Sequence, residues 1–376
     1  MSRLLIRGAA LLDANYDSAA MDIFIENDRI TAVGNHLTEC SDYVLDLTGY
    51  TLIPGLVNAH THIQCAHDYT DEKYMAMARA GVCLCHDQGF LVNEPLADMV
   101  AWAEQVNADP SFPAIDFAGR YIAVAGGYGD VIPGGFQVGE IVTNEDECRM
   151  AVDYLARSGA RCIKIGMDQG KSSLEDAITL PDSFVKAICD QAKSLGLRIG
   201  AHVHELEYLK RLVHGGITEA AHIVRQSIPQ DLMDEMLANN IYLTATLTNF
   251  FRHKDRYSAD DLQNSVDNVK RYWQQGGVVA VATDFMWPFE QYMAPLEEMR
   301  LFRLTGMTTR DIIVCATLNG AIVSNLADNY GTLEPGKLAC MLAVKGPIDD
   351  NFNVLESPAF VMNRGKILVN HLEESK

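Results

Sequence analysis

The chain has 376 residues, 48% of them hydrophobic and 21% charged, which is typical of a folded globular protein and excludes a disordered or fibrous one. Fifty acidic against 30 basic side chains give a formal net charge of −20. Neither a nucleic acid nor an anionic membrane surface is therefore expected as a partner, because both are bound by clustered Lys and Arg. No apolar run reaches the roughly 18 residues that span a bilayer, and acidic residues follow the N-terminus too closely for a signal peptide, so we predict a cytoplasmic protein.

The two ends of the chain share a pattern of short strands. LLIRGAALLD and DIFIENDRITAVG alternate apolar and polar residues, with a hairpin turn at Asn27-Asp28, and YVLDLTGYTLI predicts a third strand. An apolar strand over 338–344 and a hairpin in AFVMNRGKILVN, with Asn363-Arg364-Gly365 at its tip, follow near the C-terminus. Neither end has enough strands to bury a core alone. We therefore expect residues 1–53 and 332–376 to pair into one small composite β-sandwich.

Residues 54–331 alternate between β-rich runs and amphipathic helical stretches, such as 181–195, 230–239 and 259–275. This alternation predicts parallel strands with crossover helices. The runs are 55–62, 81–87, 116–125, 161–166, 198–204, 218–222, 241–246 and 278–284. Eight such strands over this length favour an α/β fold of the (β/α)8 TIM-barrel type. A doubly wound sheet is the alternative, but neither half has a Gly-rich phosphate loop after its first strand.

Six residues that bind metals or move protons stand at the ends of these predicted strands. They are His60 and His62 in NAHTHI, Lys164 in CIKIG, His202 in GAHVH, His222 in AAHIV and Asp284 in VATDF. The C-terminal ends of barrel strands meet at one mouth, so these side chains are expected to become neighbours. Positions i and i+2 of a strand face the same side, so both imidazoles of the HxH pair can reach one cation.

Lys164 differs from the other five because an ammonium group repels a metal. Burial beside cations disfavours its charged form. A neutral lysine amine can add carbon dioxide, and the resulting carbamate has two anionic oxygens able to bridge two metals about 3.5–4 Å apart. The sequence itself places only a lysine at a strand end facing the cluster, so the carbamate on Lys164 is a hypothesis.

The motifs PGLVNAHTH, IKIG, GAHVH, AAHI and ATDF, in this order, resemble the amidohydrolase superfamily over essentially the whole chain. The tail ATLNGAIVSNLADNYGTLEPGKLA resembles its imidazolonepropionase- and prolidase-like (Xaa-Pro dipeptidase-like) branch. The resemblance implies a binuclear centre with His60, His62 and Asp284 on one metal, His202 and His222 on the other, and carboxylated Lys164 as the bridge. It also implies a homo-oligomer. Two divalent ions are expected, with zinc as the default.

The implied reaction is hydrolysis of an amide or peptide C–N bond in a small molecule, such as a dipeptide or an N-acyl amino acid. A metal-bound water that ionises near neutral pH would attack the carbonyl, and Asp284 would act as general base and then general acid. An ester or lactone is an alternative substrate. A mononuclear deaminase or cyclic-amide hydrolase is another alternative, although such enzymes generally lack a bridging lysine. A non-catalytic relative would have lost ligands, whereas all six positions are filled here.

Four further residues are candidates for binding substrate. His204 faces the same side of its strand as His202. His86 ends the second strand, and Tyr128 lies in the Gly-rich sequence after the third. Arg225, just past His222, is the candidate for binding a substrate carboxylate, with a surface position at a helix start as the alternative.

Overall fold

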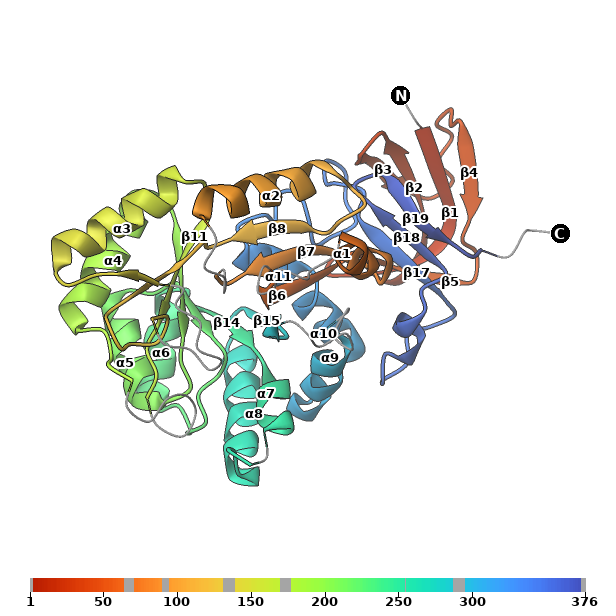
Figure 1. The fold of residues 1–376 in the computed structure, drawn as a ribbon. Helices are drawn as coiled ribbons and strands as arrows, with labels where there is room; N and C mark the ends of the chain where they lie inside the picture. The colour runs from red at the N-terminus through yellow and green to blue at the C-terminus, as the bar shows by residue number, and fades with distance from the viewer. Residues whose placement is uncertain are drawn as a thin grey trace.

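The computed structural model describes residues 3–63, 71–89, 95–130, 139–169, 177–253, 255–286 and 295–372. One sheet gathers strands from both ends of the chain, and it lies beside a larger body of helices and parallel strands (Figure 1). Within the described ranges no helix has the length and apolar character needed to cross a membrane.

The sheet of the chain ends has eight strands in the order β19-β18-β17-β5-β1-β2-β3, with β4 also paired to β1. Its strands are β1 (Arg3–Leu12), β2 (Asp17–Glu26), β3 (Arg29–Gly34), β4 (Tyr43–Asp46), β5 (Tyr50–Pro54), β17 (Met341–Lys345), β18 (Phe360–Asn363) and β19 (Lys366–Asn370). Strand β5 joins the two ends of the chain, because it runs parallel to β1 on one side and antiparallel to β17 on the other. The predicted pairing of the two ends is confirmed.

Both predicted hairpins are present, and both turn through left-handed backbone. Asn27 between β2 and β3 has a φ of 58°, and Arg364 and Gly365 between β18 and β19 have φ of 47° and 78°. Positive φ at both central residues, as at Arg364 and Gly365, is the turn geometry that matches the twist of paired strands, whereas in the first hairpin only Asn27 has a positive φ. The prediction of one strand over YVLDLTGYTLI is wrong, because Gly49, at a φ of 83°, lies in a turn that separates β4 from β5. The two pieces occupy the same edge of β1.

A hydrophobic cluster lies on this sheet and draws on both chain ends. Ile6 and Leu11 of β1 are fully buried in it together with Met341 and Phe360 from the C-terminal strands. Burial of one aliphatic or aromatic side chain contributes about 1.5–3 kcal/mol. The terminal strands thus complete a core that neither end could form separately.

The larger body contains parallel strands in two hydrogen-bonded sheets, ordered β10-β9-β11-β12-β13-β14-β15 and β16-β6-β7-β8. The strands are β6 (Leu56–His62), β7 (Val82–Asp87), β8 (Ala114–Phe117), β9 (Tyr121–Ala123), β10 (Gly139–Ile141), β11 (Cys162–Gly166), β12 (Arg198–His202), β13 (Glu219–Ala221), β14 (Tyr242–Ala245), β15 (Val279–Val281) and β16 (Phe285–Met286). Each of the eight predicted runs contains at least part of one of these strands.

Backbone hydrogen bonds link the two parallel sheets at two places. The N–H of Arg161 donates to the carbonyl of Phe117 at 2.9 Å, and the N–H of Asp284 donates to the carbonyl of His60 at 3.0 Å. The single strand predicted over 116–125 is wrong, because Gly119, at a φ of 77°, separates β8 in one sheet from β9 in the other. These contacts follow the strand order expected of a ring.

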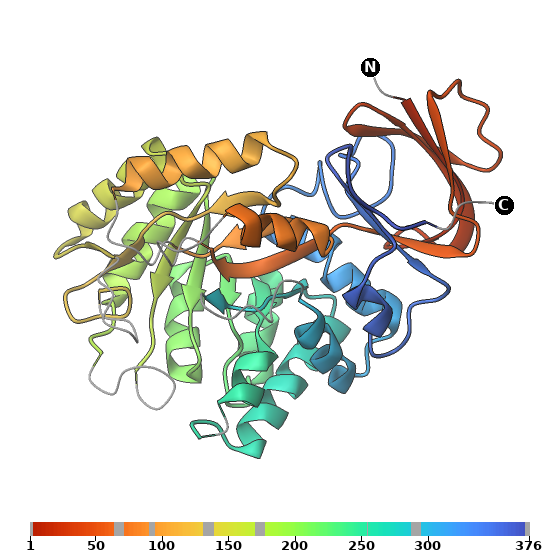
Figure 2. The same ribbon diagram turned by 45° about the vertical axis from the view of Figure 1, so that its right-hand side comes forward.

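Helices surround the parallel strands on the outside (Figure 2). They are α1 (Asp71–Arg79), α2 (Leu96–Ala108), α3 (Glu145–Arg157), α4 (Asp182–Ser194), α5 (Leu206–Gly215), α6 (Gln230–Ala238), α7 (Leu247–Arg252), α8 (Ala259–Gln274), α9 (Leu296–Phe302), α10 (Thr309–Cys315) and α11 (Leu318–Val323), with 3-10 turns η2 (Arg303–Thr305) and η3 (Asn353–Glu356). The three helices predicted over 181–195, 230–239 and 259–275 are α4, α6 and α8. Helix α8 begins at a capping box, in which the Ser258 side chain and Asp261 satisfy each other's backbone N–H.

Candidate metal centre

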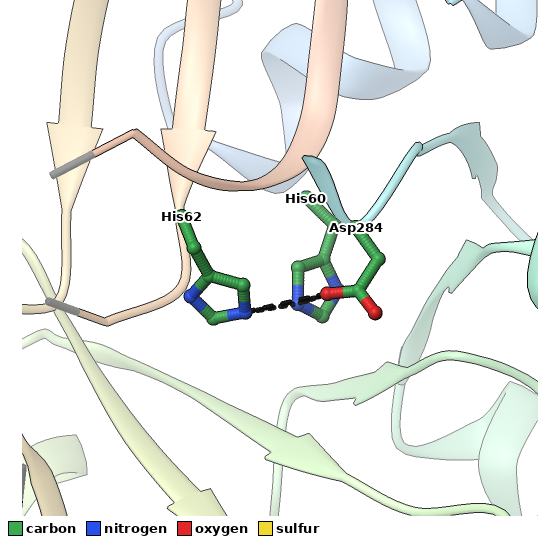
Figure 3. A group of neighbouring side chains, drawn as sticks. All are labelled: His60, His62 and Asp284. Carbon is green, nitrogen blue, oxygen red and sulfur yellow. Dashed lines mark hydrogen bonds and ion pairs between the residues drawn. The ribbon is translucent and has the colours of Figure 1, made fainter. Parts of the chain in front are cut away.

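Two histidines of β6 and an aspartate that follows β15 converge at the C-terminal ends of their strands (Figure 3). His60 Nε2 and His62 Nε2 are 3.3 Å apart. The Oδ1 atom of Asp284 lies 3.5 Å from the first nitrogen and 3.3 Å from the second. The strand alternation that places His60 and His62 on one side therefore brings three donor atoms to a common point.

The spacing of these three atoms fits a divalent cation. Donors bound tetrahedrally to zinc at about 2.0–2.1 Å lie about 3.3 Å from one another. His62 Nδ1 lies 2.8 Å from the carbonyl of Gly89. A carbonyl only accepts, so this nitrogen carries the hydrogen and His62 Nε2 keeps its lone pair for a metal. The donor set of two imidazoles and one carboxylate is one that zinc prefers.

The backbone is strained at two residues of this region, Asp284 and His222. Asp284 has a φ of 53° and His222 a φ of 74°, values in the left-handed region that residues other than glycine rarely adopt. Such strain costs about 1–3 kcal/mol per residue and is concentrated at functional sites. Asn249 Nδ2 donates to Asp284 Oδ2 at 2.9 Å and so fixes the carboxylate in its direction.

The protonation states at this point suit metal binding. Burial lowers the pKa of His60 well below its usual value, and Lys164 adds to the effect. Burial also holds the pKa of His222 well below the ordinary value. Burial opposes ionisation of Asp284, but His222, His62 and Asn249 outweigh it and lower the pKa of that carboxyl far below its usual range. Neutral imidazoles and an ionised carboxylate are the forms that bind a metal.

A second group of donors lies around His202, at the end of β12. Asp168 Oδ2 is 3.3 Å from His202 Nε2 and 3.1 Å from His204 Nδ1. His222 lies between the two groups, since its ring centroid is 4.6 Å from those of His60, His202 and His204. All four predicted histidine ligands are therefore neighbours. Asp168 was not predicted, because it follows β11 by two residues and so carries no strand-end signal.

Lys164 is fully buried on β11, and its Nζ donates to Gln88 Oε1 at 3.0 Å. Burial lowers the pKa of its amine to about 8, against the opposing influence of Glu219 and Asp284. A lysine in this environment loses its proton more readily than a solvated one. Lys164, which was predicted at a strand end, lies in the middle of β11 and is an interior group.

His86 belongs to a buried ionic network and not to an open surface. Its Nδ1 lies 2.7 Å from Asp116 Oδ2 and its Nε2 lies 3.1 Å from Glu219 Oε2. Burial alone would lower the pKa of His86, but Glu219 and Asp116 raise it to about 10. Glu219 also accepts hydrogen bonds from Gln88 and Thr244. With both ring nitrogens occupied and no exposed surface, His86 has no group left to offer a substrate.

The other three candidate substrate contacts differ in their surroundings. Tyr128 stacks on His202 with ring centroids 3.8 Å apart and an interplanar angle of 15°. His204 lies in the second donor group, next to His202. Arg225 Nε donates to Glu205 Oε1 at 2.6 Å, and its Nη1 donates to Asp261 Oδ1 at 3.3 Å. Tyr128 and His204 border the centre, whereas two carboxylates neutralise Arg225.

Known proteins resemble this chain in sequence and in fold. The sequence model described as "Amidohydrolase family" matches residues 51–368. A 5-methylthioadenosine/S-adenosylhomocysteine deaminase of Thermococcus sibiricus is 39% identical over 62 residues, which cover 16% of this chain and only 15% of the deaminase. An imidazolonepropionase of Alkaliphilus metalliredigens is 22% identical over 403 residues, with 92% of this chain and 91% of that protein covered.

A similar solved structure is that of a Xaa-Pro dipeptidase with bound methionine, at a TM-score of 0.81 and 21% identity, with 98% of this chain and 100% of that one covered. At that identity the likeness shows the fold. The family match extends from β5 into β19 and includes every predicted metal ligand. The chain belongs to the amidohydrolase family, and its homologues include hydrolases that act on C–N bonds.

Proposed function

We propose that this protein hydrolyses the amide bond of a small molecule such as a dipeptide or an N-acyl amino acid, using a binuclear metal centre. The observation that carries the proposal is the group of His60, His62 and Asp284, whose donor atoms lie 3.3–3.5 Å apart. Imidazolonepropionase and Xaa-Pro dipeptidase are similar to this chain over nearly its whole length, and both are named for substrates that contain a C–N bond.

The proposed architecture is a closed (β/α)8 barrel over 54–331 with a β-sandwich built from 1–53 and 332–376. The hydrogen bonds that join the two parallel sheets at Phe117 and at His60 support closure of the ring. The sandwich is supported by the pairing of β5 with β17. In such a barrel the ligands share the C-terminal mouth, where barrel enzymes carry their active sites.

In this proposal His60, His62 and Asp284 would hold one ion, while His202 and His222 would hold the other. Lys164, as a carbamate formed with carbon dioxide, would supply further anionic oxygen ligands. The interior position of Lys164 and the lowered pKa of its amine favour carbamate formation. Two bound zinc ions would supply Lewis acidity and lower the pKa of water to near neutrality.

Asp284 carries the proton transfers in the proposed mechanism. Its Oδ2 is held by Asn249, and its Oδ1 lies among the imidazoles of β6. As general base it takes a proton from the attacking water, and as general acid it returns the proton to the nitrogen of the leaving amine. Burial of the centre excludes bulk water, which strengthens each electrostatic contact made there.

A deaminase is the second candidate function, because the 62-residue match at 39% identity is to a deaminase. Metal content separates the two possibilities: two ions per chain agree with the amide hydrolase, and one ion agrees with a mononuclear deaminase. An ester or lactone hydrolase would share the binuclear centre and differ only in its substrate.

The test is a screen of the zinc-reconstituted protein against dipeptides, N-acyl amino acids, cyclic amides, lactones and aminopurine nucleosides, with metal content measured on the same preparation. We expect release of an amino acid from at least one linear amide and two metals per chain. Turnover confined to deamination of a ring, with one metal per chain, would contradict the proposal. Asp284→Asn is the control for contaminating hydrolases.

A further inference from the structure

Glu298 of α9 is a carboxylate without exposed surface that caps a helix other than its own. Helix α9 packs beside α7 (Figure 1). Glu298 Oε1 accepts the backbone N–H of Leu247 at 2.7 Å, and Oε2 accepts that of Thr248 at 2.8 Å. These two residues begin α7, and N–H groups at the start of a helix have no partner within it. A carboxylate from a distant part of the chain therefore satisfies the N-terminus of α7.

This contact replaces the usual cap of the helix. Thr246 is the residue directly before α7, and a threonine there ordinarily accepts the N–H of the second or third helical residue through its hydroxyl. Its side chain makes no such bond here. The Thr246 hydroxyl oxygen lies instead 2.8 Å from Nδ1 of His222. Because Glu298 caps the helix, the hydroxyl of Thr246 is available to the histidine.

Asn249, in the first turn of α7, makes a second contact with the centre. Its Nδ2 donates to Asp284 Oδ2 at 2.9 Å and to Thr246 Oγ1 at 3.4 Å. Thr246 and Asn249 thus contact two predicted metal ligands that come from different strands, His222 after β13 and Asp284 after β15. The places of both side chains depend on the helix end that Glu298 holds.

We propose that Glu298 is a positioning residue of the metal centre. By capping α7 it keeps Thr246 against His222 and Asn249 against Asp284, and so holds these two proposed ligands in place. Groups that hydrogen-bond to metal ligands orient them and tune metal affinity. The role rests on the metal centre of the proposed function, but it does not depend on which amide is the substrate.

The two hydrogen bonds require the ionised form of Glu298. A carboxylate accepts through both oxygens, whereas a protonated carboxyl uses one of them as a donor. Burial raises the pKa of Glu298 to about 8, against the N–H groups of Thr248 and Leu247 and the charge of Arg252. Experiments at pH 9 therefore observe the capped helix. Glu298→Gln removes the charge and one acceptor at nearly constant shape.

The first experiment tests the cap in the metal-free protein by 1H–15N NMR at pH 9. We expect the amide signals of Leu247 and Thr248 and the side-chain amide of Asn249 to shift in Glu298→Gln. The side-chain amide of Asn363 is the internal reference, because it donates to the carbonyls of Pro110 and Phe112 and should not move. Unchanged signals at α7, or equal shifts at the reference, would overturn the proposal.

The second experiment measures zinc affinity at pH 9 by competition with a chromogenic chelator. Loss of a residue that orients a metal ligand typically weakens binding about 10–100-fold, and we expect a loss of this size in Glu298→Gln. Asp13→Asn is the matched control, since Asp13 is equally buried and accepts backbone N–H groups of Asn15, Tyr16 and Leu333. Unchanged affinity in Glu298→Gln, or an equal loss in the control, would refute the role.

Asn249→Ala keeps the cap and removes the contact with Asp284, so it tests the same route if Glu298→Gln does not fold. We expect its zinc affinity to fall about 10–100-fold, and unchanged affinity would overturn the proposal. Residues that act through one another have non-additive effects, so Glu298→Gln should weaken zinc binding at least about threefold less in the Asn249→Ala background than in the wild type. Losses that multiply fully would show that Glu298 does not act through Asn249 and would likewise refute this route.

Kinetics on an amide substrate separate this role from the proposed function. We expect Glu298→Gln to lower kcat more than it raises KM, because the printed contacts of Glu298 reach the centre only through α7. An unchanged kcat would refute the positioning role and leave the function intact. If the NMR signals and the zinc affinity change as expected but no amide is hydrolysed, the positioning role stands and the proposed function fails.

Discussion

Two of the places where the described residues bury histidines and carboxylates together differ in their outcome. Around His60 and His62 the donor atoms are 3.3–3.5 Å apart, and His60 has a lowered pKa. Around His86 the ring nitrogens lie 2.7 and 3.1 Å from Asp116 and Glu219, and the pKa is raised to about 10. In the first arrangement the donor atoms have the spacing that a bound cation requires. In the second the ring itself is the cation.

This difference shows that residue type does not distinguish a metal ligand from a structural ion pair. Both regions lie on parallel strands of the same body, and both are buried. The deciding quantity is whether a carboxylate can approach an imidazole nitrogen to hydrogen-bond distance. Where it can, the histidine holds a proton and cannot bind a metal through that nitrogen.

The largest expected effect is a loss of activity at the proposed metal centre. Asp284→Asn keeps the shape of the side chain but removes a ligand charge and the general base, so we expect kcat to fall by about 10²–10⁴-fold. Steady-state kinetics on the amide identified in the screen measure it. Asp13→Asn is the control, because Asp13 is a buried carboxylate that accepts backbone N–H groups of Asn15, Tyr16 and Leu333 outside the centre. A fall of less than threefold would mean that Asp284 takes no part in proton transfer.

Removal of the His86 side chain is expected to destabilise the buried ionic network that it forms with Asp116 and Glu219. His86→Leu leaves Asp116 and Glu219 buried without their cation, and we expect the free energy of unfolding to fall by about 3–5 kcal/mol. Urea denaturation measures the change. His214→Leu is the matched control, because its ring is 66% exposed beside Glu235 and is expected to cost less than about 0.5 kcal/mol. Equal losses in both variants would refute the network.

Removal of zinc distinguishes the metal centre from the ionic network of His86 within one protein preparation. An ion present at 100 times its Kd stabilises the folded state by about 2.7 kcal/mol for each site. We expect chelation to lower the free energy of unfolding of the wild type by this amount per ion, and of His86→Leu by the same amount. In His62→Ala the stabilisation by zinc should be smaller. Unequal responses in the wild type and His86→Leu would mean that the ionic network and the metals are coupled.

The pH dependence of stability in the metal-free protein should have opposite signs for the two regions. The folded pKa of His86 is about 10, above the value of about 6.5 in an unfolded chain. Its contribution is complete below pH 6.5 and is lost as the pH rises toward 10. Burial lowers the pKa of His202 to about 4, so its contribution is lost as the pH falls from 6.5 toward 4.

Unfolding curves between pH 4 and 10 test these signs. We expect the alkaline loss of stability to be reduced in His86→Leu and the acid loss to remain. An alkaline slope that is the same with and without His86 would assign the loss to other groups.

The smallest expected effect concerns Arg225. Glu205 and Asp261 already engage its guanidinium, which is 27% exposed. We expect Arg225→Gln to cost about 1 kcal/mol or less in stability and to change KM equally for substrates with a free and an esterified carboxylate. A rise in KM confined to substrates with a free carboxylate would support the substrate-binding role predicted from the sequence.

Much of the fold and part of the centre could be predicted from the sequence. Period-two alternation identifies His60 and His62 as neighbours on one face, and turn residues such as Asn27 and Gly365 locate the hairpins. Strand-end motifs in a fixed order point to the amidohydrolase family. These signals are local, because strand period and turn geometry depend on residues close together in the chain.

The tertiary structure alone decided which side chains pair. Glu219 contacts His86, which lies 133 residues away in the sequence, and Asp168 contacts His204, which lies 36 residues away. Arg225 donates hydrogen bonds to Glu205 and Asp261 across separate elements. Local periodicity gives the face on which a side chain lies but not the register of the neighbouring strand or the path of the following loop. Those depend on packing of the whole body, which also divided the third predicted strand at Gly119.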